Sequence, residues 1–74
     1  MNKIEEIEEQ IQSAKKENKS LYEIYNLFIL YCHEKKMSIY SREVFDEILR
    51  FFPRNENTKL YDYCIWMLNN QIDF

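Results

Sequence analysis

The residues of this sequence that could carry out chemistry are two cysteines and one histidine. Cys32 and His33 are neighbours, whereas Cys64 lies far from both along the chain. A nucleophilic cysteine needs a histidine within hydrogen-bond reach and a third group that orients the imidazole ring. Adjacent side chains on a helix point about 100° apart, so Cys32 and His33 do not form such a pair. The sequence therefore predicts a protein that is not an enzyme.

The same residue types argue against a bound metal or cofactor. A structural zinc site usually takes four cysteine or histidine ligands, and this chain offers only two cysteines and one histidine. Loops that cradle phosphate groups are rich in glycine, and the sequence contains no glycine. We expect neither a metal nor a cofactor.

Charge and hydropathy limit the location of the protein and its partners. Lys3 against Glu5, Glu6, Glu8 and Glu9 accounts for the whole net charge of −3. An acidic start is unlike a signal peptide, and the longest apolar run is far shorter than the roughly 20 residues that a membrane span needs. A free-standing DNA-binding domain is usually basic. We expect a cytoplasmic protein that does not contact a membrane and binds DNA weakly on its own.

The elements that would position these residues are predicted from apolar spacing and caps. A chain of 74 residues is short enough for a single domain. Ile4, Ile7, Ile11 and Ala14 recur at helical spacing, which predicts an N-terminal amphipathic helix within residues 1–18. This helix either packs as a lid on the rest of the domain or associates with another copy of itself.

Residues 20–53 predict two helices joined by a turn. Ser20 and Glu23 form a capping box at the start of the first helix. The apolar sector of that helix is roughly twice as wide as that of an ordinary surface helix, so we expect it to be central and to touch another chain. The second helix runs from Arg42 to the residue before Pro53, which cannot continue it. Its predicted apolar side comprises Val44, Phe45, Ile48, Leu49 and Phe52.

Residues 57–74 fit two kinds of structure. Their apolar residues recur at helical spacing, but residues 61–66 also have high strand propensity. Asn57 or Thr58 can cap a helix and no glycine marks a hairpin, so we predict a helix. A short strand paired with residues 37–40 is the alternative. The predicted fold class is all-α, or mainly α, with three to four short helices.

Residues 20–52 also carry a family resemblance. The residues concerned are Tyr22, Tyr25, Tyr31, Cys32, Lys35, Lys36, Ser41, Phe45 and Leu49. Paired tyrosines, an aromatic residue beside a cysteine, a basic turn and Ser, Phe and Leu at spacing four form a pattern that resembles the C-terminal helix-turn-helix module of phage and plasmid primase–helicases. The resemblance implies a winged-helix-like domain in which Tyr25, Phe45 and Leu49 pack the two helices together. The glycine-containing wing of that family is missing here.

The resemblance implies a role in DNA replication. The chain is similar in kind to the small accessory proteins that mobile elements, such as staphylococcal cassette elements, encode beside a polymerase or primase. We therefore expect an adaptor that binds a primase, polymerase or helicase and helps that enzyme hold DNA. Aromatic residues are enriched at the centres of protein interfaces. The candidate partner-binding residues are Tyr22, Ile29, Leu30, Trp66 and Phe74.

A second set of residues could contact nucleic acid directly. The candidates are Lys35, Lys36, Arg42, Arg50 and Arg54. In a helix-turn-helix the second helix presents its N-terminal residues to the DNA groove, but Glu43, Asp46 and Glu47 on this helix would repel phosphates. Two alternatives to the adaptor stay open: a homodimeric helix-turn-helix regulator that binds DNA, and a phage-type inhibitor that covers a host protein with its acidic first helix.

Overall fold

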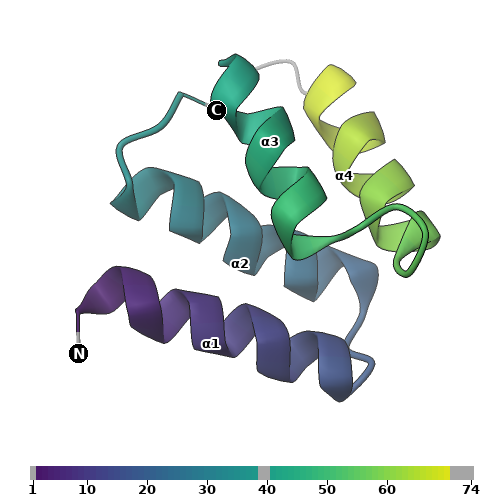
Figure 1. Ribbon diagram of the computed structural model, residues 1–74, viewed down its shortest axis with the longest axis horizontal. Helices are drawn as coiled ribbons and strands as arrows, with labels where there is room; N and C mark the ends of the chain where they lie inside the picture. The colour runs from purple at the N-terminus through teal and green to yellow at the C-terminus, as the bar shows by residue number, and fades with distance from the viewer. Residues whose placement is uncertain (1, 39–40, 71–74) are drawn as a thin grey trace.

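The computed structural model describes residues 2–38 and 41–70, which form four α-helices (Figure 1). The helices are α1 (Lys3–Lys16), α2 (Leu21–Glu34), α3 (Arg42–Phe51) and α4 (Thr58–Asn69). These residues contain no strand, so the predicted all-α class is confirmed. The C-terminal segment, which fitted either a helix or a strand, forms helix α4. The winged-helix-like arrangement stays a prediction.

Helix α2 lies at the centre of the molecule, as its wide apolar sector predicts. Figure 1 shows α1 running antiparallel to α2 on one side, with α3 and α4 on the other side. The apolar stripe of α1 faces inward, because Ile7, Ile11 and Ala14 are buried and Ile4 packs against the core at its edge. The stripe is therefore used inside the fold, where it packs α1 as a lid.

Caps define the helix ends in a chain that has no glycine. The side chains of Asn2 and Ser20 accept hydrogen bonds from the backbone N–H groups three residues on, at 2.8 and 3.1 Å. Helices α1 and α2 both end in a Schellman motif. The residues that take the left-handed conformation in these motifs are Asn18 (φ 55°) and Lys36 (φ 58°).

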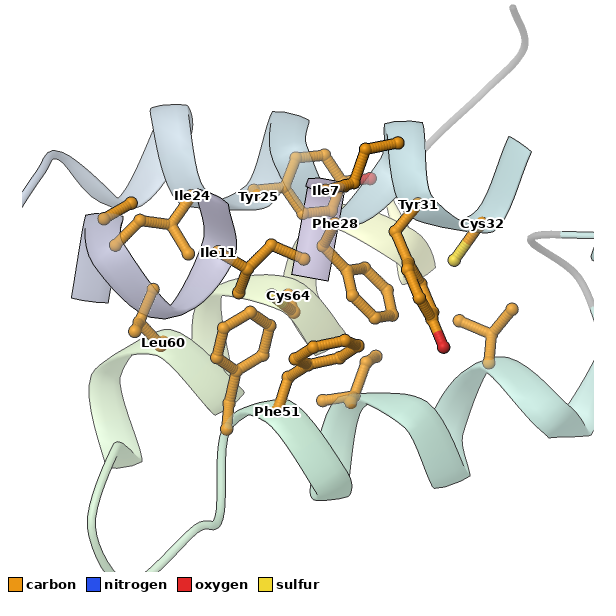
Figure 2. Close-up of a cluster of buried hydrophobic side chains, with 14 of the residues drawn as sticks. Ile7, Ile11, Ile24, Tyr25, Phe28, Tyr31, Cys32, Phe51, Leu60 and Cys64 are labelled. Carbon is orange, nitrogen blue, oxygen red and sulfur yellow. The ribbon is translucent and has the colours of Figure 1, made fainter. Parts of the chain in front are cut away.

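The core is aromatic at its centre (Figure 2). The ring of Phe28 on α2 lies 6.4 Å from that of Tyr31, 6.0 Å from Phe51 and 5.8 Å from Phe52, measured between ring centroids. The buried apolar residues are Ile7, Ile11, Ala14, Ile24, Tyr25, Phe28, Tyr31, Cys32, Val44, Ile48, Phe51, Phe52, Leu60, Cys64 and Leu68. All four helices contribute to this core.

The predicted apolar side of α3 is wrong in two positions. Phe45 is 39% exposed and Leu49 is 47% exposed, so these residues do not pack α3 onto α2. The helix packs instead through Val44, Ile48 and Phe51, which are buried. Each exposed residue follows a buried one in sequence and so points about 100° away from it. Helix α3 thus has a second apolar side, which faces outward.

Candidate functional site

The predicted partner-binding residues differ in their exposure. Tyr22 and Trp66 are each 59% exposed, and Leu30 is 42% exposed. Ile29 is half-buried and packs against the core, so it contributes less free surface than the sequence suggested. Phe74 lies outside the described residues.

Helices α2 and α4 hold the exposed members of this set in place. Tyr22 and Ile29 lie seven residues apart on α2 and therefore share one side of that helix. Trp66 lies on the side of α4 opposite to its buried residues Leu60, Cys64 and Leu68. An edge-to-face contact between the rings of Tyr25 and Tyr63, with centroids 5.9 Å apart, fixes α4 against α2. The two helices that carry the exposed aromatic residues therefore pack against each other.

Two exposed apolar residues on α3, Phe45 and Leu49, were not among the predicted contact residues. We name this pair the α3 ridge. The two residues lie four apart and therefore stand one above the other on the helix surface. The sequence shows that Phe45 and Leu49 share one side of a helix. It does not show that this side is exposed, because the buried residues of α3 fit helical spacing equally well.

Two of the predicted DNA contacts, Lys35 and Arg50, form hydrogen bonds with the carboxylate of Glu47. Oε2 of Glu47 accepts hydrogen bonds from the hydroxyl of Tyr31 and from Nζ of Lys35, both at 3.0 Å. Oε1 of Glu47 accepts from Nε of Arg50 at 2.7 Å. Nη2 of Arg50 also donates to Oε2 of Glu8 at 3.1 Å and to the hydroxyl of Tyr31 at 2.7 Å. We name these five residues the Glu47 cluster.

The electrostatics of the Glu47 cluster favour its charged form. Burial opposes the charge on Glu47, yet hydrogen bonds from Arg50, Lys35 and Tyr31 outweigh burial and hold the pKa of the carboxyl below its ordinary value. The hydrogen bond to Glu47 raises the pKa of Lys35. The cluster joins α1, α2 and α3, so its charges stabilise the fold. Because these charges are paired with one another, they attract an outside ligand less strongly.

The remaining predicted DNA contacts are spread over the surface. Lys36 holds the left-handed position after α2, and Arg42 is exposed in the first turn of α3. Arg54 follows the other end of α3, where its guanidinium lies 5.5 Å from the ring centroid of Tyr61. The structure therefore does not gather the five predicted basic residues into one patch.

The two cysteines and the histidine differ in their burial. Cys32 and Cys64 are buried, and burial raises the pKa of each thiol to about 12. His33 is exposed on α2. Within residues 2–38 and 41–70, no three His, Cys, Asp or Glu side chains are grouped so that they could hold a metal ion.

Shallow grooves on both sides of α1 are rimmed by glutamates. One groove, of about 620 Å³, lies between α1 and α3 and includes Glu5, Glu9 and Phe51. The other, of about 510 Å³, lies between α1 and α2 and includes Glu6 and Glu9. An inhibitor role for this acidic helix stays a prediction. In the part of the chain that the structure describes, no helix combines the length and the apolar character needed to cross a membrane.

Comparison of the chain with protein-family models, with curated proteins and with solved structures finds no match.

Proposed function

We propose that this protein is a non-enzymatic adaptor that binds another protein through exposed aromatic residues on α2 and α4. The observation that carries the proposal is the exposure of Tyr22 and Trp66, each 59%, on a domain whose core is already filled by other aromatic residues. Tryptophan and tyrosine are the residues that most often dominate the binding energy of an interface. Exposed apolar patches on soluble domains mark interaction sites, and without a partner they favour aggregation.

The partner that we propose is a DNA replication enzyme, namely a primase, a polymerase or a helicase in the cytoplasm. This choice rests on the resemblance of residues 20–52 to the helix-turn-helix module of primase–helicases. Two positions of that resemblance, Phe45 and Leu49, are exposed and so do not play the packing role that it implies. Of the other apolar positions, Tyr25, Tyr31 and Cys32 are buried in the core, and Tyr22 is exposed.

Direct DNA binding through α3 has less support. The exposed side chains of α3 include Glu43, Phe45, Asp46 and Leu49. Acidic groups repel phosphates, and apolar groups form no hydrogen bonds with base edges. Arg50, the basic residue nearest the end of the helix, is paired with Glu8 and Glu47. The adaptor function is therefore proposed without a DNA-reading role for α3.

The proposal is tested by measuring the binding of the purified protein to the primase, the DNA polymerase and the helicase of the genetic system that encodes it. We expect one of the three to bind. Tyr22→Ala and Trp66→Ala should each weaken that binding about tenfold or more, as expected for central aromatic residues of an interface. Both residues are exposed, so the variants should fold.

The matched control is Phe45→Ala, which removes an exposed aromatic ring from α3 instead. This variant should bind the enzyme as the unchanged protein does. Absence of binding to all three enzymes would overturn the replication role. If Tyr22→Ala and Trp66→Ala leave the affinity unchanged and Phe45→Ala weakens it, the proposed surface is wrong.

A further inference from the structure

The α3 ridge is an apolar surface that neither the core nor the proposed adaptor surface uses. Phe45 and Leu49 stand one turn apart on the outer side of α3, whose inner side is filled by Val44, Ile48 and Phe51. Figure 1 shows α3 beside α4 on the side of α2 that faces away from α1. A second copy of the chain could therefore approach the N-terminal half of α3, away from the contact of Arg50 with Glu8 of α1.

Two opposite charges border the α3 ridge and form no ion pair with the residues that the structure describes. Arg42 and Asp46 are exposed, lie four residues apart and so share one side of the helix. Neither takes part in an ion pair within residues 2–38 and 41–70. Lys35, Glu47 and Arg50, by contrast, are all paired. The unpaired charges thus adjoin the exposed apolar residues.

The positions of these charges suit a two-fold symmetric contact. Along the helix axis, the midpoint between Arg42 and Asp46 is level with Val44, about 1.5 Å from the level of Phe45. If two α3 helices pack antiparallel about this point, Arg42 of each copy lies opposite Asp46 of the other. The two Phe45 rings then meet near the axis, whereas each Leu49 lies about 7.5 Å from it along the helix, at the edge of the contact. Every contact of a two-fold interface occurs twice, so one Arg–Asp pair on the surface provides two ion pairs.

We propose that the α3 ridge binds a second copy of this chain, with α3 antiparallel to α3 of the second copy and Arg42 paired with Asp46 across the axis. The ridge is small beside the roughly 800 Å² per partner of a standard interface. The dimer is therefore weak and is populated only at high protein concentration. It uses a surface separate from Tyr22 and Trp66, so self-association and adaptor binding can succeed or fail independently.

The test is sedimentation equilibrium of the purified protein from about 10 µM to 1 mM. We expect reversible dimers. Phe45→Ala, Asp46→Arg and Arg42→Asp should each raise the dissociation constant about tenfold or more. The exchange variant R42D/D46R restores both ion pairs with their signs reversed, so it should dimerise within about threefold of the unchanged protein. An equal mixture of the two single charge variants should form mixed dimers.

Three outcomes would overturn the proposal. The first is a protein that stays monomeric at 1 mM. The second is an exchange variant that dimerises no better than its two parent single variants, which would show that Arg42 and Asp46 do not face each other. The third is a dimer that Trp66→Ala abolishes, because the contact would then lie on α4. Far-ultraviolet circular dichroism of each variant confirms that the helices are retained.

Discussion

The hydroxyl of Tyr31 lies 3.0 Å from Oε2 of Glu47, and this hydrogen bond joins the central helix α2 to α3. The same carboxylate binds Lys35 and Arg50, and Arg50 continues the chain of contacts to Glu8 on α1. A hydrogen-bonded charge that is largely removed from water stabilises a fold only while its partners remain. The Glu47 cluster is therefore a polar feature of the fold that a single substitution can disrupt.

Removal of the Glu47 side chain should destabilise the protein by about 2 kcal/mol, the usual scale for hydrogen bonds to a charged group. The side chain is only 13% exposed. Its loss leaves the Tyr31 hydroxyl and Lys35 without their acceptor, and Arg50 keeps only its bonds to Glu8 and Tyr31. Urea unfolding of Glu47→Ala, followed by circular dichroism, measures the effect. Asp46→Ala on the same helix is the control and should change the free energy of unfolding by about 0.5 kcal/mol or less. Equal effects of both substitutions would show that the cluster adds nothing.

The contribution of Glu47 should depend on pH in a defined direction. The pKa of this carboxyl is lowered in the folded state from its ordinary value of 4.5, so folding favours the ionised form. The stabilisation is fully present above pH 4.5 and is lost as pH falls through the lower folded pKa. We expect the free energy of unfolding of Glu47→Gln to differ most from that of the unchanged protein at pH 7. The difference should shrink as the pH falls below 4.5; a constant difference would contradict the prediction.

Lys36→Gly should stabilise the protein by about 0.5–1 kcal/mol. Lys36 has φ 58°, and a side chain with a Cβ atom is strained in this left-handed conformation, whereas glycine is not. The gain in stability is reduced because glycine also raises the conformational entropy of the unfolded chain. Thermal unfolding of the variant gives the sign. Gln12→Gly, at an exposed position in the interior of α1, is the control and should destabilise by about 1 kcal/mol. Destabilisation by both would mean that the strain is absent.

The helices themselves were predictable because their signals are local. The Ser20 cap and the stripe from Ile7 to Ala14 each involve residues within a few turns of one another, and the structure confirms both. The wide apolar sector of α2 also predicted its central place correctly, because a short chain has few other helices to cover such a surface.

The surface of the protein was harder to predict because it depends on distant pairings. Lys35 and Arg50 seemed free to contact DNA from the sequence. Glu47 lies close to Lys35 only after α3 packs near α2, and Glu8 lies close to Arg50 only after α1 packs beside α3. The exposure of Phe45 likewise depends on which side of α3 meets the core, and its helical spacing fits either side. Contacts between residues distant in sequence therefore set which charges and rings stay available.

Cys32 and Cys64 should resist thiol reagents in the folded protein. Both side chains are buried, and the pKa of each is raised to about 12 because burial disfavours the thiolate. The thiolate is the reactive form, so at pH 8 fewer than about one thiol in a thousand is ionised. Modification with a disulfide reagent should follow unfolding, with two thiols per chain reacting in urea. Ser13→Cys, at an exposed position of α1, should add one thiol that reacts at once in the native state. Rapid native labelling of the unchanged protein would show that α2 and α4 open readily, and it would place a reactive thiol within reach of a ligand.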